Sequence, residues 1–183
     1  MTERKKKTEY YFDTETTGLN PEKDKIITIQ WQKLDRDTGK PISDLQILKE
    51  WESSEKDILE KFLPNLSCYY WDFVFIGQNL LFDFMFFDRR LKHHGLGEFD
   101  LSCAQKRVIL DIKPILVMIN GDFIGYDELL DKNGTVKVNV PELYEQKRYP
   151  EIIKYIKEET SDFLEAFQIL KKKMPSLSKL FGK

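Results

Sequence analysis

Alternating apolar and polar residues in the first third of the chain predict three β-strands. The predicted strands span residues 8–14, 24–35 and 44–52, and side chains two residues apart share a face of each strand. In the second strand, the two expected faces consist of Ile27, Ile29 and Trp31 on one side and Ile26, Thr28 and Gln30 on the other. The turn residues TGLNPEKD separate the first two strands, so we expect a hairpin-like connection between them.

Longer periodic segments and short apolar runs predict the remaining elements. Helices are expected over residues 53–66, 82–95 and 149–173, and short strands at 72–77 and 107–112. Gly95 ends the second helix and Pro150 suits the first turn of the third. The pattern over residues 113–149 is ambiguous and does not place its elements. Strands interspersed with helices indicate the α/β class, with a mixed β-sheet flanked by α-helices.

Composition narrows the class of protein only slightly. A chain of 183 residues that is 41% hydrophobic suits a single domain over residues 1–183 with a sizeable core. The formal net charge of -2 neither supports nor excludes a nucleic-acid partner, because local patches matter more than the sum. The lysines at 5–7 and 171–173 are expected to be solubilising charges near the ends of the chain.

Cysteine content and hydropathy indicate the cellular setting. Cys68 and Cys103 show no zinc-type spacing, and two cysteines make a disulfide framework improbable. The charged N-terminus has no apolar signal core, and no stretch approaches membrane-spanning length. We therefore expect an intracellular, cytoplasmic protein.

The segment EYYFDTETTG, residues 9–18, runs from aromatic residues directly into two acids. Asp13 and Glu15 lie two residues apart on a predicted strand, so their carboxylates share one face. Two neighbouring acids repel each other, and they are either solvated or compensated by a cation.

Two further segments add isolated acids. Asp83 stands in an apolar run near a predicted helix start, where it is either an ordinary first-turn acid or part of a site. In the last helix, Tyr155 and Glu159 lie four residues apart beside the apolar stripe, and Asp162 lies further from that stripe.

Together, these acids suit a pair of hard cations. Asp13, Glu15, Asp83 and Glu159 are four carboxylates on three separate elements, and oxygen ligands suit Mg²⁺ or Mn²⁺. Two divalent ions about 3.5–4 Å apart clamp the attacking and leaving oxygens of a phosphoryl transfer. In such a site, Tyr155 is expected to orient the attacking water.

The same residues form a pattern that resembles the DEDD superfamily of 3′–5′ exonucleases, which have a ribonuclease H-like fold. The first motif is matched by YYFDTETTGLNPEKDKIITIQW and the second by FIGQNLLFDFMFFDRRL, with Asn79, Phe82 and Asp83 in place and Gln78 where histidine is frequent. The tyrosine-type third motif is matched by YIKEETSDFLEAFQIL, except that its final acid is Glu159. Asp162 is the alternative fourth acid, although no tyrosine or histidine precedes it at the motif's spacing.

The resemblance covers roughly residues 8–171, with a weak match over 95–148, and it implies an activity. By resemblance, the chain is a metal-dependent exonuclease that shortens single-stranded DNA or RNA from the 3′ end and releases nucleoside 5′-monophosphates. Thr16, Leu19 and Asn79 are then expected to bind the terminal nucleotide, with Leu19 wedged against the last base. Leu19 tucked back onto the sheet is the structural alternative.

The sequence leaves the activity and the roles of several charged residues open. Because Glu159 departs from the motif, the chain is alternatively a catalytically weakened or inactive module that binds 3′ ends or a polymerase. An endonuclease on the same fold is a third reading, and any proofreading would act in trans with a polymerase. Arg89, Arg90 and Lys92 are either phosphate contacts or a solvated basic helix end, and Asp111 and Asp122 are expected to be strand-end or loop acids.

Overall fold

One mixed sheet organises the protein. The computed structural model describes residues 8–66, 73–99, 108–121, 130 and 138–173. Its five strands are β1 (Thr8–Thr16), β2 (Ile26–Leu34), β3 (Gln46–Lys49), β4 (Phe73–Gly77) and β5 (Ile109–Asp111). They lie in the order β3-β2-β1-β4-β5. The β1–β2 and β2–β3 pairs are antiparallel, whereas β4 runs parallel to both β1 and β5.

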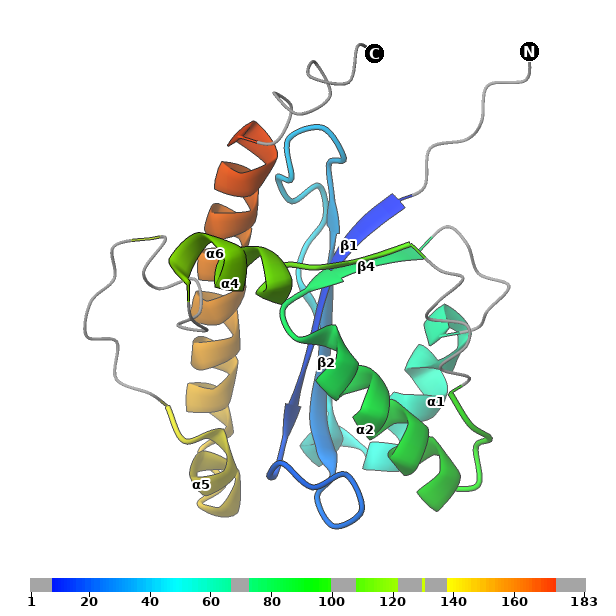
Figure 1. Cartoon of the computed structure of the whole chain (residues 1–183). Helices are drawn as coiled ribbons and strands as arrows, with labels where there is room; N and C mark the ends of the chain where they lie inside the picture. The colour runs from blue at the N-terminus through cyan, green and yellow to red at the C-terminus, as the bar shows by residue number, and fades with distance from the viewer. Residues whose placement is uncertain (1–7, 67–72, 100–107, 122–129, 131–137, 174–183) are drawn as a thin grey trace.

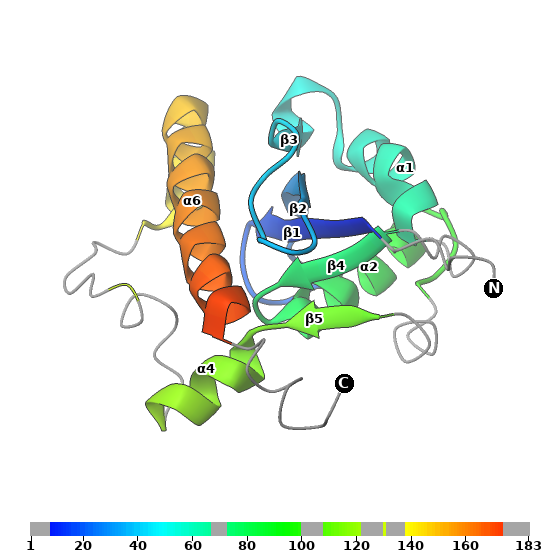
Figure 2. The same cartoon turned by 90° about the horizontal axis from the view of Figure 1, so that it is seen from above.

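Helices cover both faces of this sheet. The helical elements are η1 (Glu50–Glu52), α1 (Glu55–Leu66), α2 (Leu80–His93), α4 (Lys113–Asn120), α5 (Val140–Glu145) and α6 (Tyr149–Lys173). Both views place α1 and α2 on one side of the sheet and the long α6 on the other (Figures 1 and 2). The expected α/β class and the mixed sheet flanked by helices are confirmed.

The alternation of β1 divides its side chains between the two helical layers. Phe12 faces α1 and α2, with its ring centroid 5.3 Å from that of Phe62 and 5.9 Å from that of Phe87. Tyr11 faces the other way, and its ring centroid lies 4.9 Å from that of Phe163 on α6. The period of two therefore also sends Asp13, which follows Phe12, toward α6.

A β-bulge in the β1–β2 hairpin corrects one predicted face. Glu15 pairs with Thr28 and Thr16 with Ile26, so Ile27 has no partner on β1. Ile27 consequently joins the buried cluster under α5 and α6, whereas Ile26 and Ile29 share the cluster under α1 and α2. The predicted partition of Ile26 and Ile27 was wrong, because the unpaired residue of a bulge shifts the pleat by one position.

Element boundaries depart from the predictions at several ends. The strand expected over 44–52 ends at Lys49 and continues as η1. The helix expected over 82–95 begins at Leu80 and ends at His93, and β1 extends to Thr16. The helix over 149–173 and the hairpin-like connection are confirmed.

Two short helices, α4 and α5, were not predicted. Their 8 and 6 residues are too few to show a clear helical period, although each carries a proline in its first turn. Cys68, Cys103 and Asp122 lie outside the described residues. No helix among the described residues has both the length and the apolar character needed to cross a membrane.

Candidate metal centre

Three acids from two elements converge between the sheet and α6. Asp13 and Glu15 on β1 and Glu159 on α6 each offer one carboxylate oxygen, and these oxygens all lie within 4.8 Å of one another. We call Asp13, Glu15 and Glu159 the carboxylate cluster. Each of the three is half-buried. The strand supplies the first two acids on one face, and α6 brings the third across from the C-terminal part of the chain (Figure 1).

The electrostatics of the carboxylate cluster favour a bound cation. Burial, followed by the negative charges of Glu159 and Asp83, raises the pKa of Asp13 well above its usual value. Burial and the Asp13, Glu159 and Asp83 carboxylates, in that order, raise the pKa of Glu15 in the same way. Uncompensated, these groups oppose one another's ionisation, and a divalent cation relieves that repulsion. The residues present thus fit a hard, oxygen-ligated ion.

Asp83 is placed beside the cluster by the first turn of α2. Its side chain is buried, and Oδ1 accepts a 2.5 Å hydrogen bond from the Thr14 hydroxyl. Burial raises the pKa of Asp83 to about 7, and the nearby Asp111 carboxylate adds to the increase. Asp83 is outside the group of three whose oxygens lie within 4.8 Å, but its charge raises the pKa of both Asp13 and Glu15.

On α6, Glu159 rather than Asp162 joins the acids of β1. Among the described residues, no metal-type group of three or more acids includes Asp162. Tyr155 lies one helical turn before Glu159 and is half-buried. Burial and then the charge of Glu159 raise the pKa of Tyr155 well above its usual value, so its hydroxyl keeps its proton and can donate a hydrogen bond.

The expected nucleotide-binding residues surround the end of β1 and the start of α2. The Thr16 hydroxyl donates to the Gly18 carbonyl oxygen at 2.6 Å. Leu19 is 83% exposed, so the alternative in which it tucks back onto the sheet was wrong. Asn79 precedes α2 with a left-handed backbone (φ 62°), and its Oδ1 accepts from Lys113 Nζ at 2.8 Å.

Asp111 has a structural role that the sequence did not reveal. Its Oδ1 accepts from the Asn79 N–H at 2.8 Å and its Oδ2 from the Leu80 N–H at 2.9 Å. Oδ1 also accepts from the Lys113 N–H at 2.9 Å. An acid at a strand end immediately before a helix was the available signal, but the α2 donors come from more than thirty residues away.

The basic residues near the end of α2 form ion pairs with acidic side chains. Arg90 is buried and binds Glu55 through Nε at 2.8 Å and Nη2 at 2.7 Å. For Arg90, both alternatives, a phosphate contact and a solvated helix end, were therefore wrong. Arg89 pairs with Glu22 at 3.1 Å on the surface. Lys92 pairs with Asp88 and Glu98.

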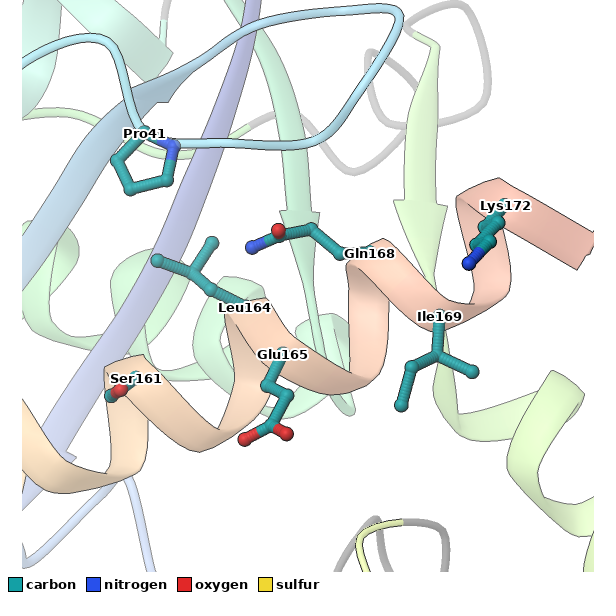
Figure 3. Close-up of a pocket in the computed structure, with 7 residues that line it drawn as sticks. All are labelled: Pro41, Ser161, Leu164, Glu165, Gln168, Ile169 and Lys172. Atoms are coloured by element: carbon teal, nitrogen blue, oxygen red, sulfur yellow. The ribbon is translucent and has the colours of Figure 1, made fainter.

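Among the described residues, α6 lines surface hollows on two sides. The larger, of about 410 Å³, lies between Pro41 and residues 161–172 and contains no member of the carboxylate cluster (Figure 3). The smaller, of about 300 Å³, lies between α5 and α6, and Tyr155 forms part of its wall. Its lining also includes Arg148, Lys154 and several glutamates, so its charges are mixed.

A family comparison agrees with this architecture. The profile described as "RNase_H superfamily" matches residues 10–122, which is more than half of the chain. The chain belongs to the RNase H superfamily. This membership and the similar structures confirm the resemblance inferred from the three motifs at the level of family and fold.

Among solved structures, this RNase H superfamily chain is similar to exonuclease I. A zinc-bound complex of E. coli exonuclease I with single-stranded DNA aligns with a TM-score of 0.64 at 12% identity, covering 96% of this chain and 43% of that one. An E. coli exonuclease I complex with a dA16 oligonucleotide gives 0.64 at 11% identity, with the same coverage. An ExoI/SSB-Ct complex gives 0.60 at 12%, covering 97% and 44%.

These likenesses show a shared fold. The chain spans less than half of the length of the exonuclease I chains that it matches. A comparison with curated proteins finds no match.

Proposed function

We propose that this protein is a metal-dependent 3′–5′ exonuclease that acts on single-stranded nucleic acid. The observation that carries the proposal is the convergence of Asp13, Glu15 and Glu159, with oxygens within 4.8 Å of one another. The shared fold with exonuclease I, which has been solved with single-stranded DNA, supports the same substrate class.

The carboxylates would hold the cations, and the remaining residues would order the substrate. Asp13, Glu15 and Glu159, with Asp83 beside them, would bind two divalent ions, Mg²⁺ or Mn²⁺. When bound, such ions activate water and neutralise developing negative charge. Tyr155 keeps its proton and would orient the attacking water by hydrogen bonding.

The terminal nucleotide would lie at the end of β1. Leu19 is exposed and available for stacking on the last base, whereas Thr16 at the end of β1 and Asn79 before α2 offer polar groups. Water attack on the terminal phosphodiester would break the bond to the 3′ oxygen of the preceding nucleotide. The products would be a nucleoside 5′-monophosphate and a strand shortened by one residue.

The direct test uses 5′-labelled single-stranded DNA and RNA with Mg²⁺, Mn²⁺ or chelator. We expect a metal-dependent ladder that shortens from the 3′ end, and the faster substrate identifies the preferred nucleic acid. An Asp13→Asn variant should lose at least about a hundredfold in rate, since charge stabilisation by bound cations contributes several kcal/mol. Asp44→Asn, an exposed loop acid, is the matched control and should cleave like wild type.

Two results would contradict the proposal. One is cleavage that persists at full rate in chelator. The other is an Asp13→Asn variant that degrades either strand as fast as the Asp44→Asn control.

A second candidate function is a module that binds 3′ ends without cleaving them. Glu159, in place of the aspartate that the third motif usually carries, favours this reading because its longer side chain alters ligand geometry. This module would bind single strands in a gel-shift assay yet release no nucleotide with either metal. Restored cleavage by a Glu159→Asp variant would identify the glutamate as the cause.

A single domain over residues 1–183 and a polymerase partner stay predictions.

A further inference from the structure

The buried amide of Gln30 lies beside Asp13, the first acid of the carboxylate cluster, on the neighbouring strand. Asp13 on β1 and Gln30 on β2 are cross-strand partners, and Gln30 Nε2 donates to Asp13 Oδ2 at 3.0 Å. The Gln30 side chain is completely buried, so water cannot replace this bond. None of the three motifs that carry the resemblance assigns a role to Gln30.

A second buried residue fixes the orientation of that amide. The Thr28 hydroxyl donates to Gln30 Oε1 at 2.9 Å, and Thr28 is also completely buried. An ionised carboxylate accepts hydrogen bonds and donates none, so the NH₂ end of Gln30 must face Asp13. The amide oxygen then needs a donor, and Thr28 supplies it. The hydrogen bonds therefore run in one donor-to-acceptor direction, from Thr28 to Gln30 and from Gln30 to Asp13.

The regular part of the β1–β2 ladder brings these hydrogen-bonded residues next to the metal centre. Before the bulge, Thr28 pairs with Glu15 and Gln30 with Asp13, so both polar residues of β2 lie across from the two acids of β1. Burying an amide and a hydroxyl beneath a sheet is costly unless each is hydrogen-bonded. Here each has a partner, and the last acceptor is a carboxylate of the site.

We infer that Gln30 and Thr28 are positioning residues that orient the Asp13 carboxylate for cation binding. The inference rests on the proposed function, because it concerns the same carboxylate cluster. The Gln30 amide holds Asp13 Oδ2, and the Tyr11 hydroxyl also lies 3.5 Å from that oxygen, so rotation of the Asp13 carboxylate is restricted. Hydrogen-bonding partners of metal ligands typically change metal affinity by 10–100-fold when removed.

The test measures Mn²⁺ binding without nucleic acid, by titration calorimetry and by electron paramagnetic resonance. Gln30→Met keeps the length of the side chain but removes the donor, and we expect about a tenfold or greater loss of affinity. Thr28→Val keeps the shape and frees the amide to rotate, with an expected loss of about two- to tenfold. Gln32→Met is the matched control: this glutamine lies on the same strand, and its amide donates to the Ser43 carbonyl oxygen at 2.8 Å. It should bind Mn²⁺ like wild type.

Each outcome decides the inference. Wild-type affinity in Gln30→Met and Thr28→Val would overturn it, even where their melting temperatures fall, because a purely structural role predicts that combination. If Gln30→Met does not fold, Thr28→Val decides alone. Wild-type protein that binds no Mn²⁺ would overturn both this inference and the proposed function, whereas normal binding in the variants would overturn the inference alone.

Discussion

At the residue scale, Asp83 shows how burial disfavours the ionised form of a carboxylate. The side chain is 2% exposed and hydrogen-bonded to Thr14, yet burial raises its pKa to about 7. A carboxylic acid in the unfolded chain loses its proton near pH 4. Between about pH 4 and pH 7 the folded state therefore binds more protons, and the free energy of unfolding falls as the pH rises.

This linkage predicts a stabilising substitution. In chelator at pH 8, Asp83→Asn should raise the free energy of unfolding by about 1–4 kcal/mol, because the amide carries no charge to bury. The advantage should disappear near pH 4, where the acid is protonated in both states. Urea unfolding at the two pH values measures it. An Asp83→Asn protein that is less stable than wild type at pH 8 would contradict the prediction.

A second residue-scale prediction separates the two acids of α6. Glu159→Gln should lower the rate of cleavage by about a hundredfold or more, because it removes a charge from the carboxylate cluster. Asp162→Asn, one turn further along the same helix, should lower it by less than about threefold. Single-turnover cleavage with Mn²⁺ measures both. The reverse order would make Asp162 the fourth acid.

At the scale of elements, the position of Asp83 depends on how α2 begins. The first donors of a helix need acceptors, and the side chain of Asn79, which precedes α2, makes no capping hydrogen bond. Asp111, at the end of β5, supplies them by accepting from the Asn79 and Leu80 N–H groups. Lys113 Nζ holds the Asn79 side chain from the next helix. The start of α2 is therefore set by the neighbouring strand.

Removing this acceptor should affect both stability and activity. We expect Asp111→Ala to lower the free energy of unfolding by about 1–3 kcal/mol, since three partly buried N–H groups lose their acceptor. Cleavage should fall about tenfold or more, because Asp83 in the first turn shifts with the helix.

Ser54→Ala is the matched control for this variant. The Ser54 hydroxyl accepts from the Asp57 N–H at 3.1 Å at the start of α1, on the same side of the sheet but outside the metal centre. This variant should lose about 0.5–2 kcal/mol of stability and keep its activity. Equal activity in the Asp111→Ala and Ser54→Ala proteins would contradict the role given to Asp111.

At the scale of the whole molecule, a buried ion pair joins the helical layer to the sheet. Glu55 at the start of α1 accepts two bonds from Arg90 of α2 and one, at 2.8 Å, from the Ile26 N–H of β2. His94 Nε2 lies 2.8 Å from the second Glu55 oxygen. Three elements, α1, α2 and β2, thus meet at one carboxylate, and Arg90 depends on it for its counter-charge.

This pair predicts a large and pH-dependent stability effect. Glu55→Ala should cost about 3–5 kcal/mol, because it leaves the Arg90 charge buried and unpaired. On the same helix, Glu60→Ala removes only an exposed pair with Lys56 and should cost less than about 1 kcal/mol. Equal losses in the two variants, measured by urea unfolding at pH 7, would contradict this.

The pH dependence of the pair follows from the same contacts. Burial alone would raise the pKa of Glu55, but hydrogen bonds from Arg90 and His94 outweigh it and hold the pKa below its usual value. A lowered pKa contributes stability that is present above about pH 4.5 and is lost as the pH falls through the folded-state pKa. The difference between wild type and Glu55→Ala should shrink on acidification.

Local patterns in the sequence were sufficient for most of the fold and for the choice of acids. The period of two located β1 and β2, and the period of 3.6 located α6 from end to end, because these elements are long enough to repeat their pattern. The same period placed Asp13 and Glu15 on one face. The preference for Glu159 over Asp162 followed from the tyrosine-type motif, in which Tyr155 precedes Glu159 by four residues, together with its position beside the apolar stripe. The geometry of the carboxylate cluster agrees with this preference.

Features that depend on residues distant in the sequence were decided only by the tertiary structure. The bulge at Ile27 depends on how two strands pair, the burial of Arg90 depends on Glu55 thirty-five residues away, and the Asp111 cap depends on the β4–β5 neighbourhood. The Gln30–Asp13 bond is of the same kind. By itself, the sequence determined where the long strands and helices lie and which acids share a face. Only packing decided which polar groups meet, because a hydrogen bond requires two atoms within about 3 Å.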